Sequence, residues 1–74
     1  MSHWNYRVYK FIPKNKANDP YFLIRETYYN DDGKANGFTL NSASPFGETE
    51  QELKNDIQYM LEAFGKPVIE QEEE

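Results

Sequence analysis

The sequence predicts an α+β fold, in which a three-stranded antiparallel β-meander is followed by one amphipathic helix packed on one face of the sheet. Three observations support this fold class. Two early segments are rich in aromatic and β-branched residues, a turn signal follows the second of them, and a helical apolar period begins after residue 49. The 74 residues suffice for one small domain, which we expect over residues 1–69, with an acidic disordered tail over residues 70–74.

The strands are predicted from composition and from the turn residues between them. Residues 4–12 (WNYRVYKFI) suit a pleated surface and end at Pro13, and residues 21–30 (YFLIRETYYN) have the same character. Residues 30–34 (NDDGK), at the end of the second segment, favour a turn, because Asn and Asp tolerate left-handed backbone angles and Gly33 adopts a positive φ at little cost. The chain should therefore turn back into a third strand at about residues 35–41.

A helix is predicted from a capping motif and from the helical spacing of the apolar residues that follow it. Thr49 and Glu52 have the spacing of a capping box, in which each side chain accepts from the backbone amide of the other residue. Apolar residues then recur at helical spacing in one stripe: Leu53, Ile57, Met60, Leu61 and Phe64. We expect this stripe to face the sheet, the acids of the helix, such as Asp56, to lie at its cap or on its solvent side, and the helix to end at Gly65. A short strand or a packing clip is predicted at residues 67–69.

The two faces of the predicted sheet differ because side chains alternate along a strand. The even-numbered face is the more apolar, and we expect the helix to cover it: Trp4, Tyr6, Val8, Phe22, Ile24, Phe38 and Leu40. The odd-numbered face is aromatic and basic, and a small monomer rarely leaves such a patch exposed. We therefore expect an interface there, with apolar contacts oriented by the arginines: Arg7, Tyr9, Phe11, Tyr21, Leu23, Arg25 and Tyr29.

The charge is unevenly distributed along the chain. Thirteen acidic and eight basic side chains give a net charge of −5, but four of the acids lie in residues 70–74, so the rest of the chain carries −1. Divided at Gly37, the first half carries +2 and the second half −7. The sequence thus predicts a basic sheet beside an acidic helix and tail.

No catalytic, cofactor-binding or metal-binding pattern is recognisable. The chain has no cysteine, its four glycines form no phosphate-binding loop, and its one histidine, His3, has no partners for a zinc site or a catalytic triad. Glu26 is the remaining candidate for acid–base chemistry, because it shares the parity of the apolar face; alternatively, it pairs with a basic side chain across the sheet. We expect no enzyme activity, no cofactor and no metal.

Nucleic-acid binding is an alternative function. Basic side chains alternate with aromatic ones in the first half of the chain, and such surfaces can hold phosphates and stack bases: Arg7, Lys10, Lys14, Lys16 and Arg25 among Tyr6, Tyr9, Phe11 and Tyr21. The net charge of −5 opposes binding to a phosphate backbone, and only Gly37-Phe38 matches the aromatic consensus of an RNA-recognition module.

Two resemblances extend these expectations. The chain resembles a family of short uncharacterised bacterial proteins, which implies no established activity, through WNYRV at 4–8, ETYY at 26–29, DGK at 32–34, GET at 47–49, Leu53, MLEA at 60–63 and KPV at 66–68. The meander followed by Gly47-Glu48-Thr49 and an amphipathic helix is also similar to the HicB-like antitoxin domain. That resemblance implies a truncated ribonuclease-H-like fold and binding to a small toxin.

The sequence therefore predicts a small non-catalytic module that acts through protein contacts. We expect it to self-associate as a homodimer through the aromatic sheet face or an edge strand, or else to bind a small protein partner. The N-terminal residues MSHWNYR have no apolar core and no small-residue cleavage site, so we expect a cytoplasmic protein without a membrane segment.

Overall fold

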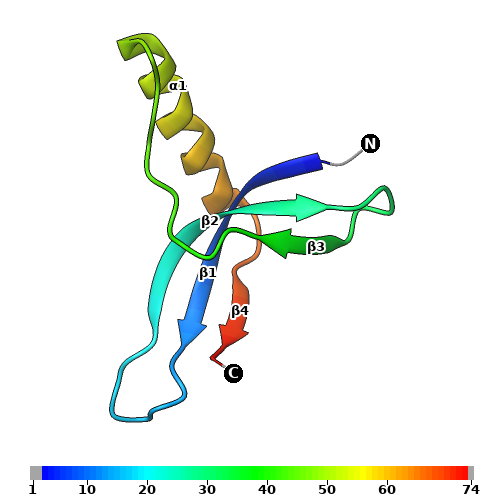
Figure 1. Ribbon diagram of the computed structural model, residues 1–74, viewed down its shortest axis with the longest axis vertical. Coiled ribbons are helices and arrows are strands. Elements are labelled where there is room, and N and C mark those ends of the chain that lie inside the picture. The colour runs from blue at the N-terminus through cyan, green and yellow to red at the C-terminus, as the bar shows by residue number, and fades with distance from the viewer. Residues whose placement is uncertain (1–2, 74) are drawn as a thin grey trace.

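The computed structural model describes residues 3–73, which form an α+β fold with a curled, mixed four-stranded sheet (Figure 1). The elements, in chain order, are β1 (His3–Ile12), β2 (Tyr21–Tyr29), β3 (Ala35–Phe38), α1 (Glu50–Leu61), the 3₁₀-helix η1 (Glu62–Gly65) and β4 (Ile69–Glu72). The sheet order is β3-β2-β1-β4. β2 pairs antiparallel with both β1 and β3, as the predicted meander requires, but β4 adds a parallel neighbour on the other side of β1.

The turn between β2 and β3 forms as predicted. Gly33 has a φ of 80°, and its amide donates to the carbonyl of Asn30 at 2.9 Å. The Asn30 side chain accepts from the amides of Asp32 and Lys34, each at 3.0 Å. The side-chain oxygen thus takes the place of a backbone acceptor in the turn, which is the reason that Asn favours such positions.

The side chains of β3 lie on the faces of the sheet opposite to those predicted. The reason is that the pairing of β2 and β3 shifts its register between Tyr28 and Tyr29. Phe38 is paired with Thr27, so its side chain lies on the odd-numbered face, where its ring centroid is 5.5 Å from that of Tyr9. The prediction that Phe38 belongs to the even-numbered face is therefore wrong. A one-residue irregularity exchanges the faces for every side chain beyond it.

β4 replaces most of the predicted disordered tail. Residues 70–72 pair with β1 as far as Ile12, and the amide of Glu73 donates to the carbonyl of Ile12 at 2.9 Å. Ile69 and Gln71 lie beside Tyr9 and Phe11 on the odd-numbered face and are partly buried, whereas Glu70 and Glu72 are exposed. The acidic run therefore has the alternation of an edge strand, with its charges on the solvent side.

Deleting residues 70–74 is expected to lower the free energy of unfolding by about 2 kcal/mol, because several β4 hydrogen bonds are lost and each contributes about 0.5–1.5 kcal/mol. Urea unfolding followed by circular dichroism measures this change. The double variant Glu70→Gln/Glu72→Gln is the control: it removes two exposed charges, keeps the strand, and should change stability by less than about 0.5 kcal/mol. If the truncated chain unfolded like the full chain, β4 would contribute nothing to stability.

α1 begins as predicted and is oriented differently. The Thr49 Oγ1 caps the helix by accepting from the Glu52 amide at 3.1 Å. Of the predicted apolar stripe only Met60 is buried, at 7% exposure, whereas Leu53, Ile57, Leu61 and Phe64 are between 37% and 67% exposed. The prediction that the whole stripe faces the sheet is wrong.

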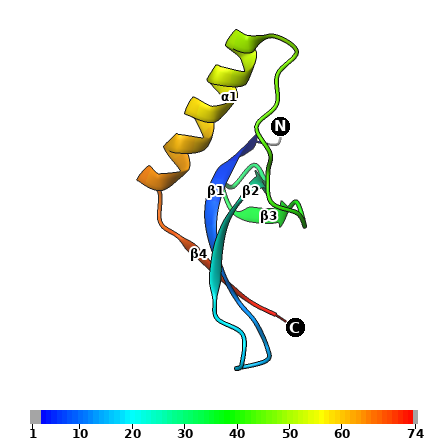
Figure 2. The same cartoon turned by 90° about the vertical axis from the view of Figure 1, so that its left-hand side faces the viewer.

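A different side of α1 meets the sheet. Its buried or partly buried residues are Asp56, Tyr59 and Met60, continued in η1 by Ala63. The centre of this side lies about 100° around the helix axis from the centre of the predicted apolar stripe. Both views show the N-terminal end of α1 extending beyond the sheet, while its C-terminal end lies near β1 (Figures 1 and 2).

The core is small and lies where the end of α1 meets the even-numbered face. Its buried members are Tyr6, Val8, Met60 and Ala63, with Ile24, Ala43 and Tyr59 packed against them. The helix thus covers the even-numbered face, although only over the middle of the strands. Phe22 and Leu40, which the sequence places under the helix, are exposed. Within residues 3–73, no helix has the length and hydropathy to cross a bilayer.

Candidate functional site

The odd-numbered face, the predicted interface, is partly closed by the chain itself. Tyr9 is 2% exposed and Arg25 is 6% exposed. The Arg25 guanidinium lies 5.0–5.9 Å from the ring centroids of Tyr9, Phe11 and Phe38, and it donates to the side chain of Gln71 on β4. Arg25 is therefore held by aromatic rings and an amide of its own chain, and it is not presented to a partner.

Arg7 and Tyr29 are also occupied by contacts within the chain. Arg7 donates to the hydroxyl of Tyr29 at 3.0 Å and to the carbonyl of Pro67 at 2.6 Å, and the Tyr29 hydroxyl donates to Asn5 Oδ1 at 2.8 Å. Arg7 lies directly opposite Arg25 across the β1–β2 pair. The acceptors named above for both guanidinium groups are neutral, and the Nε atoms of Arg7 and Arg25 are buried without a hydrogen-bond partner among residues 3–73.

The remaining candidates lie toward the β1–β2 loop, where the face is more open. Phe11 and Leu23 are partly buried and Tyr21 is exposed, with the rings of Phe11 and Tyr21 5.2 Å apart. The structure thus brings all seven predicted residues onto one face, where Tyr9 and Arg25 are buried, Tyr21 is exposed and the other four are partly buried. The same closure removes Tyr9 and Arg25 from the surface that nucleic-acid binding would need.

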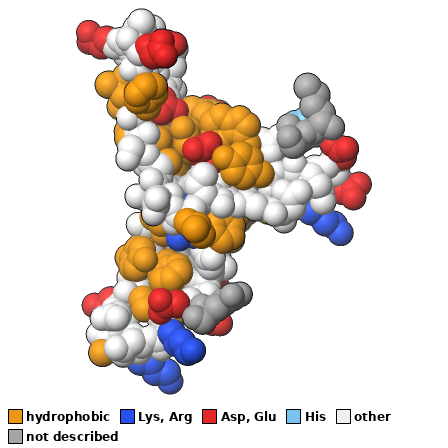
Figure 3. All heavy atoms as spheres, viewed as in Figure 1, with side chains coloured by type: hydrophobic (Ala, Val, Ile, Leu, Met, Phe, Trp, Pro, Cys, Tyr) orange, Lys and Arg blue, Asp and Glu red, His pale blue; other side chains and the backbone are white. Residues whose placement is uncertain are grey.

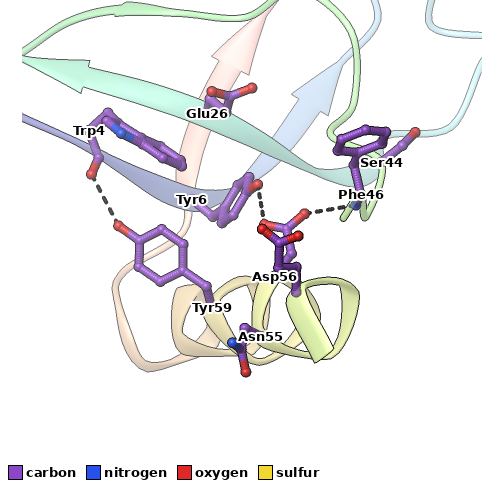
Figure 4. Close-up of a pocket in the computed structure, with 9 residues that line it drawn as sticks. Trp4, Tyr6, Glu26, Ser44, Phe46, Asn55, Asp56 and Tyr59 are labelled. Atoms are coloured by element: carbon purple, nitrogen blue, oxygen red, sulfur yellow. Dashed lines mark hydrogen bonds between the residues drawn. The ribbon is translucent and has the colours of Figure 1, made fainter. Parts of the chain in front are cut away.

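A cleft of about 600 Å³ lies between α1 and the even-numbered face of the sheet (Figure 4). Its lining comes from β1, β2, the loop after β3, and α1: Trp4, Tyr6, Glu26, Ser44, Phe46, Glu52, Asn55, Asp56 and Tyr59. Four of these side chains are aromatic, three are carboxylates, and none is basic. On this face of the molecule, hydrophobic side chains gather where helix and sheet meet and surround an acidic group (Figure 3).

Asp56 of α1 connects the helix to two of the other segments that line the cleft, β1 and the loop after β3. Its Oδ1 accepts from the Tyr6 hydroxyl of β1 at 2.7 Å, and its Oδ2 accepts from the Phe46 amide of the loop at 2.9 Å (Figure 4). The prediction that Asp56 lies on the solvent side of the helix is therefore wrong. A carboxylate that accepts two such bonds fixes the loop and the strand relative to α1, since hydrogen bonds to charged acceptors are among the stronger ones.

Three aromatic rings form one wall of the cleft. Trp4, Tyr6 and Tyr59 have ring centroids 5.2–5.5 Å apart in edge-to-face arrangements, a favourable geometry for aromatic pairs. The Tyr59 hydroxyl donates to the carbonyl of Trp4 at 3.2 Å. The cluster places aromatic groups from a strand and a helix beside the carboxylates.

The carboxylates make the cleft electronegative, and two tyrosines respond to them. Burial, together with the hydrogen bond and the negative charge of Asp56, raises the pKa of Tyr6 well above its usual value. The pKa of Tyr28, whose hydroxyl donates to Glu26 Oε1 at 3.2 Å, is also raised, by reduced hydration and by that carboxylate. Among residues 3–73, no three acidic or histidine side chains are arranged to hold a metal ion.

Tyr6→Phe is expected to lower the free energy of unfolding by about 1–2 kcal/mol at neutral pH, because the hydrogen bond to the Asp56 carboxylate is lost. Since the pKa of Tyr6 is raised in the folded state, its contribution is complete below about pH 10 and is lost as the pH rises toward the folded pKa. The wild type should therefore lose more stability than Tyr6→Phe above pH 10, as measured by denaturant unfolding across that range.

Tyr28→Phe is the matched control for this prediction. It also removes a tyrosine that donates to a carboxylate, but at an exposed site, and it should change stability by less than about 0.5 kcal/mol. Equal losses for the two variants would contradict a structural role for the Tyr6–Asp56 bond.

The comparisons give no relative for this chain: no protein-family model, no curated protein and no solved structure matches it.

Residue patterns in the sequence do not mark Trp4, Asp56 or Tyr59 as site residues. Asp56 and Tyr59 are three residues apart in a helix and so share a side of it, as the structure shows. The helical spacing of apolar residues is strongest in the stripe beside them, and it predicts that the stripe faces the sheet. No local sequence signal shows that a helix will pack its less apolar side against the sheet.

Proposed function

We propose that this protein is a non-catalytic interaction module that self-associates through the exposed apolar side of α1 and η1. We name this surface the helix stripe: Leu53, Ile57, Leu61 and Phe64. The exposure of these four side chains carries the proposal. Isolated apolar side chains are normal on a surface, but a row of four on one side of a helix is typical of an interaction site.

The amount of exposed surface supports a partner. The chain has an accessible area of 5777 Å², whereas a monomer of its mass is expected to have about 4,800 Å². Its radius of gyration is 13.7 Å, against about 11 Å for a compact domain of this length. The excess of about 1,000 Å² is close to the area of about 800 Å² that each protein loses in a standard interface.

A second copy of the chain fits the helix stripe. The four residues cover three turns of helix, and two such stripes related by a two-fold axis would face each other in an antiparallel arrangement. The other surfaces proposed from the sequence are less suitable. Tyr9 and Arg25 of the aromatic face are buried, and the β4 edge carries the exposed acids Glu70 and Glu72, which oppose edge pairing.

Light scattering coupled to size exclusion, across micromolar concentrations, tests the proposal. We expect a mass near twice 8.8 kDa that falls toward the monomer on dilution. A chain that remains monomeric at all concentrations would contradict self-association.

A monomeric result would instead favour a different protein partner. The resemblance to the HicB-like antitoxin domain implies a small toxin, and the charge of −7 on the second half of the chain favours a basic surface.

A further inference from the structure

The cleft between α1 and the sheet has a chemistry of its own, separate from the helix stripe. Glu52, Asn55, Asp56 and Tyr59 line it, and none of them belongs to the stripe, which lies on another side of the same helix. The cleft is open and keeps about 600 Å³ free between aromatic and carboxylate groups (Figure 4).

Aromatic faces together with carboxylates attract one kind of ligand. An ammonium or guanidinium group is drawn to aromatic rings by their quadrupole and to carboxylates by their charge. The cleft offers four aromatic side chains and three carboxylates, with no basic side chain in its lining to neutralise them. Among residues 3–73, no group of acids is arranged to hold a metal ion, whereas the aromatic side chains beside the carboxylates suit an organic cation.

We propose that this cleft binds the cationic side chain of a lysine or arginine that belongs to a second polypeptide. A polypeptide is favoured over a free small cation because the rim of the cleft is apolar and exposed: Trp4 and Phe46 lie on it, and Tyr28 donates a hydrogen bond to Glu26 beside it. A small cation would leave these side chains in water, whereas a peptide segment that carries the cation would cover them.

Trp4 provides a direct readout, since it lines the cleft and is the only tryptophan of the chain. The probe is the peptide acetyl-Ala-Leu-Lys-Leu-Ala-amide, titrated into the full chain while tryptophan emission is followed. Its reference is the same peptide with norleucine in place of lysine, which keeps the hydrocarbon and removes the charge. We expect the lysine peptide to bind about fivefold to thirtyfold more tightly, and its affinity to fall with added salt.

A pair of charge-neutralising variants locates the site. Glu26→Gln should weaken binding of the lysine peptide by about twofold to fivefold and leave the norleucine peptide unaffected. Glu62→Gln removes the same charge from an exposed residue of η1 outside the cleft and should leave both affinities unchanged. The titration is repeated in Leu61→Glu, which alters the helix stripe alone, and the same preference for lysine is expected there.

Three results would overturn the proposal. Equal affinity for the lysine and norleucine peptides would show an apolar site without cation recognition. Equal effects of Glu26→Gln and Glu62→Gln would show attraction to the net charge of the chain and not to the cleft. If n-butylammonium bound as tightly as the lysine peptide, the ligand would be a free small cation. None of these results depends on whether the chain self-associates, which light scattering measures separately.

Discussion

Leu61→Glu is expected to raise the dissociation constant of the proposed dimer by about 20-fold to 400-fold. Full burial of a leucine side chain contributes about 1.5–3 kcal/mol, Leu61 has 60% of its surface left to bury, and a two-fold interface loses the contribution twice. Because a factor of ten in affinity corresponds to about 1.4 kcal/mol, the two losses together amount to more than one order of magnitude before repulsion between the two new carboxylates is counted. Sedimentation equilibrium of variant and wild type at the same concentrations measures the change.

The fold of the variant should be unchanged, because the Leu61 side chain is 60% exposed. Leu40→Glu is the matched control: it makes the same substitution at a leucine that is 81% exposed and lies outside the helix stripe. Circular dichroism should give wild-type spectra for both variants. If Leu40→Glu dissociated the dimer and Leu61→Glu did not, the interface would lie near the loop after β3 and the proposal for the stripe would fail.

Gly47→Ala is expected to lower the free energy of unfolding by about 3 kcal/mol or to displace the loop before α1. A Cβ at this position would lie 2.7 Å from the carbonyl carbon of Glu52 and closer still to the backbone nitrogen of Leu53. These are backbone atoms in the first turn of the helix, so no side chain can move aside to relieve the contact. A domain of this length is stable by only about 4–11 kcal/mol, so the loss is a large share of the total.

Gly65→Ala provides the comparison for that substitution, because a Cβ there meets nothing within 4 Å. We expect a stability equal to that of the wild type or up to about 1 kcal/mol higher, since alanine reduces the conformational freedom of the unfolded chain. Thermal unfolding of both variants measures the difference. Similar melting temperatures for the two would mean that the loop at Gly47 does not pack against the helix in solution.

The features that the sequence predicted correctly depend on local chemistry. The turn at Gly33 and the cap at Thr49 are fixed by the side chains that form them, and composition alone distinguishes the first two strands. The errors arise where several elements compete for one surface. The side of α1 that meets the sheet is set by contacts between distant parts of the chain, such as the core cluster that Met60 shares with Val8 and the Tyr6–Asp56 bond, which joins residues 50 positions apart.

The candidate site was predicted less completely for the same reason. The seven predicted interface residues share the odd-numbered face as expected. Phe38 and Gln71 contact Arg25 on that face and help to bury it. Phe38 reaches that face through a strand irregularity, and Gln71 reaches it through a strand that pairs with the beginning of the chain. Neither event can be inferred from residue periodicity.

The position of β4 beside β1 has a consequence for the order in which the elements assemble. β1 precedes the other three strands in the chain, yet its second neighbour, β4, follows all of them. The hairpin of β1 and β2 can form from nearby residues, but the guanidinium of Arg25 lacks its amide acceptor until Gln71 docks. Because contacts between distant parts of a chain form slowly, we expect the burial of Arg25 to be completed in a late step of folding.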